Sequence, residues 1–190
     1  MEEQSGKIAV IGGTGRAGKY LVNQFLEAGY EVRALVRNPK KVSITHTKLE
    51  LVQGDARNTD SIRFLLNGCG FVVSALGQMK GEEPIFSTAT SNVLKAMEEY
   101  RINQYMVISG SGGRMRLEIK KNLKSKLITW LMKWMHPGIM ADRQKELNTL
   151  MGSNVQWTLL RLSLIQEGPS AGEVKISLQH SPGKKLALQI

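Results

Sequence analysis

Cysteine, proline and long apolar runs are scarce in this chain of 190 residues, and each shortage excludes a class of protein. The single cysteine, Cys69, excludes an intramolecular disulfide framework and a zinc cluster built on cysteines, so we expect no metal site. Five prolines stand against 19 glycines, a ratio that is more usual in an α/β protein than in a helical bundle. No segment approaches the about 20 uninterrupted apolar residues that a membrane-spanning helix needs.

The length and the 42% content of hydrophobic residues favour a single globular domain over residues 1–190. Residues 1–7 are polar and lack the basic and apolar regions of an export signal, so we expect a cytoplasmic protein. The net charge of +10 fits a nucleic-acid binder, a membrane-surface protein or an enzyme for anionic ligands. Composition alone does not choose among these three.

Short apolar runs alternate along the chain with segments of helical spacing. Strands are predicted over residues 7–11, 31–36, 49–53, 71–76, 104–109 and 156–163. Helices are predicted over residues 16–28, 59–67, 85–100, 114–135 and 140–151. Because parallel strands need long crossover connections, this order predicts an α/β fold, a Rossmann-type doubly wound parallel sheet with helices on both faces. We assign residues 1–113 to the nucleotide-binding half and residues 114–190 to the substrate side of the same domain.

A glycine-rich segment follows the first predicted strand directly and satisfies both the GxGxxG and the GxxGxxG spacing. It consists of Gly12, Gly13, Thr14, Gly15, Arg16, Ala17 and Gly18. Without side chains, the backbone can turn tightly and present its N–H groups to a pyrophosphate at the positive end of the following helix. A strand before and an amphipathic helix after are the context that this chemistry requires. The segment therefore predicts a dinucleotide site, with a purely structural tight turn as the alternative.

The residue that ends the second predicted strand indicates which nicotinamide dinucleotide binds. An acidic residue there would hydrogen-bond the ribose 2′-hydroxyl of NAD, but this chain has Arg37. A guanidinium suits a 2′-phosphate through bidentate, charge-assisted hydrogen bonds. We therefore expect NADP(H) to be favoured while NAD(H) stays open, and the alternative is that Arg37 is a solvated turn residue.

Six motifs occur in order over residues 7–168. They are IGGTGRAG at 11–18, ALVRNPKK at 34–41, VQGDARN at 52–58, VVSALG at 72–77, ISGSGG at 108–113 and WTLLRLSLI at 157–165. Together they resemble the atypical short-chain dehydrogenase/reductase superfamily, particularly its NmrA-like and biliverdin-IXβ/flavin-reductase-like branch. Members of that superfamily usually continue past the sixth strand with a strand and a terminal helix, so we expect a shortened substrate side in this chain.

The resemblance also implies roles for residues that follow the third and fourth strands. Asp55 and Ala56 would lie along the adenine, although Asp55 has a helix cap or a turn residue as its alternative role. The residues expected beside the cofactor ribose and phosphates are Ser74, Ala75, Leu76 and Gly77.

Catalysis is expected to differ from the Tyr-x-x-x-Lys route that many superfamily members use, because no tyrosine follows Tyr105. Hydride transfer to a conjugated acceptor, such as a flavin, quinone or tetrapyrrole, demands less of the protein because the acceptor delocalises charge. Ser109 is the candidate catalytic residue, in contact with nicotinamide or substrate, and its alternative is a strand-end hydrogen bonder. For His136, Lys145 and Arg161 a capping, solvated or structural role is preferred.

Residues 114–136 carry seven basic residues and one acidic residue, with apolar side chains at helical spacing. We favour a helix that covers the substrate side of the sheet over a membrane-surface or partner-binding helix, and a cap over an anionic planar substrate is a third interpretation. The expected partner is a small-molecule substrate rather than nucleic acid, and the sequence gives no oligomeric state. The alternative function is a non-catalytic NADP(H)-binding sensor of the NmrA type.

Overall fold

The computed structural model describes residues 6–79, 81–110, 137–162, 164–167 and 185–188. The helix predicted over residues 114–135 and His136 lie outside these described residues. Statements about the fold and the site below concern the described part of the chain.

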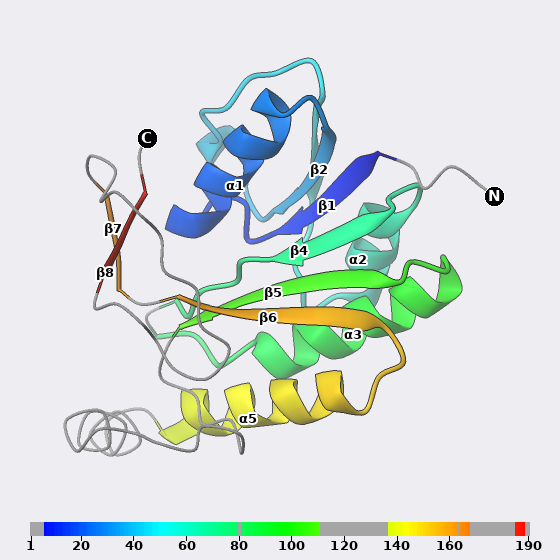
Figure 1. The fold of residues 1–190 in the computed structure, drawn as a ribbon, viewed down its shortest axis with the longest axis vertical. Helices are drawn as coiled ribbons and strands as arrows, with labels where there is room; N and C mark the ends of the chain where they lie inside the picture. The colour runs from blue at the N-terminus through cyan, green and yellow to red at the C-terminus, as the bar shows by residue number, and fades with distance from the viewer. Residues whose placement is uncertain (1–5, 80, 111–136, 163, 168–184, 189–190) are drawn as a thin grey trace.

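Six parallel strands form the central sheet in the order β3-β2-β1-β4-β5-β6 (Figure 1). Their bounds are β1 (Lys7–Ile11), β2 (Glu31–Val36), β3 (Leu49–Gln53), β4 (Phe71–Ser74), β5 (Gln104–Gly110) and β6 (Gln156–Leu162). This is the strand order of dinucleotide-binding folds. The predicted α/β Rossmann-type architecture is therefore confirmed.

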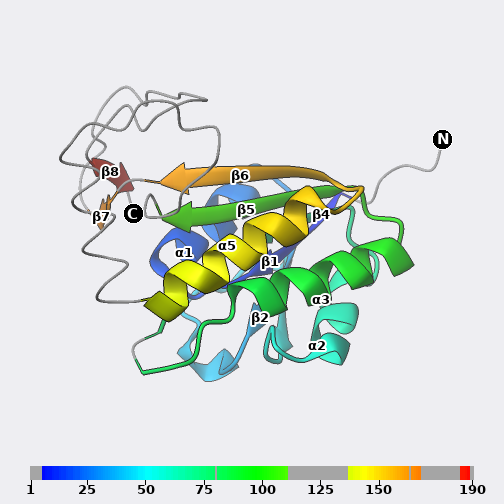
Figure 2. The ribbon, with the colours of Figure 1, turned by 90° about the horizontal axis from the view of Figure 1, so that it is seen from below.

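The helices of the described residues connect these strands as crossovers. They are α1 (Arg16–Glu27), α2 (Thr59–Leu66), α3 (Phe86–Glu99), α5 (Pro137–Met151) and the short 3-10 helix η1 (Pro39–Lys41). In Figure 2, α2, α3 and α5 cover one face of the sheet, while α1 lies on the other. Val22 and Leu26 bury α1 against its face, and Leu65, Val93 and Leu150 come from the three helices of the opposite core.

Two predicted boundaries differ from the structure by more than one residue, and one pair of strands was not predicted. The fourth strand ends at Ser74 rather than at residue 76, although the N–H of the next residue, Ala75, still donates to the Ile11 carbonyl oxygen at 2.8 Å. Helix α5 begins at Pro137 rather than at residue 140, since the fixed φ of proline suits the first helical position. Beyond β6, two strands that we had not predicted, β7 (Leu164–Glu167) and β8 (Lys185–Leu188), pair in a separate parallel sheet.

Candidate active site

The residues predicted to bind the cofactor meet at one edge of the sheet, where the parallel strands end. In the observed register Ile11 of β1 lies opposite Ser74 of β4, and Val36 of β2 lies opposite Gln53 of β3. The glycine segment, Arg37, Asp55–Ala56 and the segment after β4 therefore follow four neighbouring strands at this C-terminal edge (Figure 1). Ligands of open α/β sheets bind in the crevice at that edge.

The glycine segment leaves no room for side chains at two positions. Gly12 has a φ of +78°, and a Cβ on it would lie 2.8 Å from the carbonyl oxygen of Ala75. A Cβ on Gly18 would overlap the carbonyl oxygen of Gly12, which also accepts a hydrogen bond from the Gly15 N–H at 3.0 Å. These contacts press the start of α1 against the end of β1 and the segment after β4.

Helix α1 begins at Arg16 with Gly15 as its N-cap, so no side chain caps the first turn. Thr14, Gly15 and Arg16 are exposed, whereas Gly13 and Gly18 are buried. The first N–H groups of a helix have no partner within the helix and carry the positive end of its dipole. This geometry fits an anionic group such as a pyrophosphate, which the uncapped turn would accept.

The segment after β4 is held between the glycine segment and α5. Ser74 and Ala75 are buried, Leu76 is half-buried and Gly77 is exposed. The Leu76 carbonyl oxygen accepts a hydrogen bond from Arg143 Nη2 at 3.2 Å. This part of the edge therefore joins the glycine segment to the region beside α5.

Arg37 and Asp55 both have protein partners in this structure. Arg37 is half-exposed, and its Nη1 donates to Glu82 Oε1 at 2.7 Å while Nη2 contacts the Met79 sulfur. Asp55 is a turn residue, because its Oδ1 accepts from the Arg57 N–H at 2.8 Å. The contacts of Arg37 and Asp55 with a cofactor stay predictions.

Ala56 and the start of α2 are fixed by two asparagines. Ala56 is buried, and its carbonyl oxygen accepts from Asn92 Nδ2 at 3.0 Å. The side chain of Asn58 caps α2 by accepting from the Ser61 N–H at 2.7 Å. The helix cap that was one alternative for Asp55 therefore belongs to Asn58.

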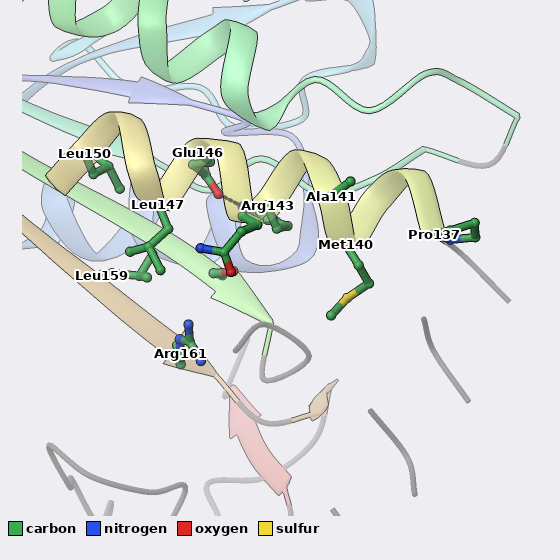
Figure 3. Close-up of a pocket in the computed structure, with 11 residues that line it drawn as sticks. Pro137, Met140, Ala141, Arg143, Glu146, Leu147, Leu150, Leu159 and Arg161 are labelled. Atoms are coloured by element: carbon green, nitrogen blue, oxygen red, sulfur yellow. Dashed lines mark hydrogen bonds and ion pairs between the residues drawn. The ribbon is translucent and has the colours of Figure 1, made fainter. Parts of the chain in front are cut away.

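A cavity of about 400 Å³ opens at the end of β5, between α5 and β6 (Figure 3). Ser109 of β5 lines it and lies opposite Arg161 of β6 in the strand register. The other lining residues come from α5 and β6 and are mostly apolar: Pro137, Met140, Ala141, Arg143, Gln144, Glu146, Leu147, Leu150 and Leu159. Such a cavity suits a small molecule with an apolar body and polar groups. Ser109 thus lines a cavity at the C-terminal end of β5, and its contact with nicotinamide or substrate stays a prediction.

Two of the side chains that line this cavity form an ion pair that we did not predict from the sequence. Arg143 Nη1 donates to Glu146 Oε2 at 2.7 Å, and the Arg143 guanidinium stacks 3.2 Å from the centroid of the Phe86 ring. Glu146 is 3% exposed, and its Oε1 accepts from Thr90 Oγ1 at 3.3 Å. Lys145, which the sequence analysis considered, is exposed on the far side of the helix. The three-residue spacing of Arg143 and Glu146 on the helix face that carries Leu147 and Leu150 is the signal that would have found the pair.

Tyr105, the last tyrosine of the chain, is a core residue rather than a proton donor for this site. It is 1% exposed on β5, and its hydroxyl lies 3.4 Å from Thr90 Oγ1. Burial raises the pKa of Tyr105 to about 12, since the phenolate would lose its hydration. The described residues thus contain no tyrosine that reaches the cavity around Ser109.

Two kinds of site are absent from the described residues. No helix there has the length and apolar character to cross a membrane. No group of three or more His, Cys, Asp or Glu side chains is placed there to hold a metal ion.

Comparisons with known proteins agree with this geometry. A family model described as NAD(P)H-binding matches residues 12–188. Protein TIC 62, chloroplastic, from Pisum sativum is 24% identical in an alignment of 181 positions that covers 81% of this chain and 32% of that protein. The chain spans about a third of the length of the curated relatives it matches first.

Solved structures show the same fold. ChuY, described as an anaerobillin reductase from Escherichia coli O157:H7, superimposes with a TM-score of 0.77 at 14% identity, covering 95% of this chain and 84% of that one. A short-chain dehydrogenase/reductase from Veillonella parvula in complex with NADP gives a TM-score of 0.70 at 16% identity, covering 95% and 81%. At these identities the likeness shows the fold alone. The shared fold and the NAD(P)H-binding family match agree with the resemblance to atypical short-chain dehydrogenases/reductases.

Proposed function

Because this chain belongs to the NAD(P)H-binding family, we propose that it is an NADPH-dependent reductase that transfers hydride to a conjugated small molecule such as a flavin, quinone or tetrapyrrole. One observation carries the proposal. The glycine segment at the start of α1, which excludes a Cβ at Gly12 and Gly18, and the cavity beside Ser109 lie at the same C-terminal edge of the sheet.

In this proposal, different residues of this edge bind the pyrophosphate, the adenine and the ribose of the dinucleotide. The uncapped first turn of α1 takes the pyrophosphate, and the close approach that Gly12 and Gly18 permit lets backbone N–H groups reach it. Asp55 and Ala56 follow β3, where the adenine lies in this type of fold. Ser74 to Gly77 pass beside the ribose and phosphates.

The preference for NADPH rests on Arg37, which follows β2 at the position that reads the ribose 2′ group. Its guanidinium is half-exposed and stands at the edge where that group would arrive. The similar Veillonella parvula structure was solved with NADP, which supports the same choice. A carboxylate at this position would instead repel the 2′-phosphate.

The cofactor, when bound, supplies a hydride at its nicotinamide ring. In the proposed reaction Ser109 donates a hydrogen bond that orients the substrate or the nicotinamide amide at the end of β5. The apolar lining of the cavity holds the body of the acceptor and excludes water around it. Because a conjugated acceptor spreads the incoming charge, solvent supplies the proton and no tyrosine is needed.

The proposal is tested by following NADPH oxidation by stopped-flow absorbance with a panel of flavins, quinones and biliverdin. We expect acceleration over the uncatalysed background for at least one acceptor, and a loss of about tenfold or more in Ser109→Ala, since a positioned hydrogen bond contributes about that much. Ser153→Ala removes a hydroxyl at the far end of α5, where it bonds the Leu150 carbonyl, and is the matched control.

Tight NADPH binding with no acceleration by any acceptor would contradict the proposal. That result would support the alternative, a non-catalytic NADP(H)-binding sensor. The cytoplasmic location and the small-molecule partner stay predictions.

A further inference from the structure

Three charged side chains from separate segments meet beside the ends of β2 and β3. Glu82 Oε1 accepts from Arg37 Nη1 at 2.7 Å, and Glu82 Oε2 lies 3.6 Å from Arg57 Nη2. Arg37 follows β2, Arg57 lies in the turn after β3, and Glu82 belongs to the segment between β4 and α3. One carboxylate therefore bridges two guanidinium groups that the sequence separates by 20 positions.

Arg57 has two further contacts that fix its direction. Its Nη1 lies 3.6 Å from Asp55 Oδ2, and its Nη2 donates to the Glu83 carbonyl oxygen at 2.9 Å. These contacts hold the guanidinium between Asp55, Glu82 and the Glu83 carbonyl oxygen. The two arginines thus form a prearranged pair around one anionic group.

The position of the pair coincides with the ribose 2′ subsite of the fold. Val36 and Gln53 lie opposite each other at the ends of β2 and β3, and the arginines follow these two ends. In this architecture the residue after the second strand meets the 2′ substituent of the adenosine ribose. An anion held by both Arg37 and Arg57 is therefore located where a 2′-phosphate would bind.

Charge favours the phosphate over the carboxylate at this place. A phosphate monoester carries a charge of about −1.5 to −2 at pH 7 and offers three acceptor oxygens, whereas Glu82 carries a single charge and two oxygens. Guanidinium forks bind such oxygens bidentately. The side chains of Arg37, Arg57 and Glu82 are 48%, 36% and 36% exposed, and ion pairs between side chains this exposed contribute little to stability. Displacement of the Glu82 carboxylate by a phosphate therefore lowers the free energy of unfolding only slightly.

We propose that Arg57 is a second residue of the 2′-phosphate subsite, and that Glu82 occupies this subsite until the phosphate of NADP(H) displaces it. The inference rests on the proposed use of NADP(H) and adds to it a specificity residue and a competitor. Arg57 raises the affinity for the 2′-phosphorylated cofactor. Glu82 lowers that affinity and leaves the rest of the adenosine site unchanged.

The test uses two probes that differ only in the 2′-phosphate, adenosine 2′,5′-bisphosphate and 5′-AMP, titrated into the full chain by calorimetry. Arg57→Gln is expected to weaken the binding of the bisphosphate by about tenfold, because a charge-assisted hydrogen-bond pair is lost. The affinity for 5′-AMP should stay within about twofold of the native value. Glu82→Gln is expected to raise the affinity for the bisphosphate by about threefold to tenfold and to leave the affinity for 5′-AMP unchanged.

The Arg63–Glu99 ion pair supplies matched controls. It joins two exposed side chains of α2 and α3 at 2.6 Å, away from the glycine segment. Arg63→Gln and Glu99→Gln make the same charge changes and should leave both affinities within about twofold of the native values.

The failure of the inference and of the proposed function are distinguishable. If Arg37→Gln weakens the bisphosphate but Arg57→Gln and Glu82→Gln do not change it, the inference is overturned and the use of NADP(H) stands. If the folded native protein binds neither the bisphosphate nor NADPH, both are overturned.

Discussion

At the C-terminal edge of the sheet, the sequence predicts the contacts of some single residues but not of others. Gly12 and Gly18 could be predicted as close backbone contacts, because glycines at this spacing between a strand and a helix are typical of such packing. The partner of Arg37 could not be predicted, since Glu82 comes from a segment 45 positions away with no motif of its own. For single residues, local backbone packing can therefore be predicted from the sequence, whereas ion pairs between distant segments cannot.

Replacing Gly18 by alanine should destabilise the fold by about 1–3 kcal/mol, the usual cost of forcing extra volume into close packing. The new Cβ would overlap the carbonyl oxygen of Gly12, which is backbone and cannot rotate away. Urea unfolding monitored by circular dichroism gives the free energy of unfolding. Gly138→Ala is the control, since its Cβ would lie 3.8 Å from the Pro84 side chain. Equal stability of Gly18→Ala and the native chain would contradict the packing described here.

Arg37→Asp should weaken NADPH binding by about tenfold or more and NADH binding far less. The change removes a guanidinium from the expected 2′-phosphate subsite and puts a second carboxylate beside Glu82. Calorimetric affinities for both dinucleotides measure the difference. Equal losses for NADPH and NADH would count against a contact between Arg37 and the 2′-phosphate.

Among the helices, α5 contacts both the start of α3 and the segment after β4 through two neighbouring residues, Asp142 and Arg143. The N-cap of α3 is Ile85, which has no side-chain cap. Asp142 of α5 caps α3 instead, since its Oδ2 accepts from the N–H groups of Phe86 at 2.8 Å and Ser87 at 3.2 Å. The next residue, Arg143, bonds to the segment after β4. The sequence could predict that this helix exists, but not these contacts, because they depend on how α3 and α5 pack.

Asp142→Ala should therefore lower the free energy of unfolding by about 1–2 kcal/mol, the effect of losing a helix cap. Denaturant titration of the variant checks the value. Asp60→Ala removes an exposed carboxylate from the first turn of α2 and should cost only about 0.5 kcal/mol. If both substitutions cost the same, Asp142 does not act as the cap of α3.

At the scale of the whole molecule, the central sheet could be predicted because each strand is a short apolar run followed by a helical pattern. The pair β7 and β8 could not, since each strand has only four residues and the sequence between them is rich in Gly, Pro, Ser and Lys. The core of this sheet holds two groups that ionise at high pH. Burial raises the pKa of the Cys69 thiol to about 11 and that of Tyr105 to about 12.

Both groups keep their protons to higher pH in the folded chain than in the unfolded chain. Unfolding therefore releases protons above pH 9 from Cys69 and above pH 10 from Tyr105, and stability falls as the pH rises. Tyr105→Phe removes the phenol titration. Between pH 10 and 12 the native free energy of unfolding should fall more steeply than that of the variant, by up to about 1.4 kcal/mol per pH unit. Parallel curves from denaturant unfolding would contradict the burial of an ionisable hydroxyl.

The central claim is that a nicotinamide dinucleotide binds along the C-terminal edge of this sheet. Titration calorimetry of the folded native chain with NADPH and then with NADH tests it most directly. We predict one binding site, with NADPH bound more tightly than NADH and each displacing the other. The absence of binding by both dinucleotides to correctly folded protein would contradict the account.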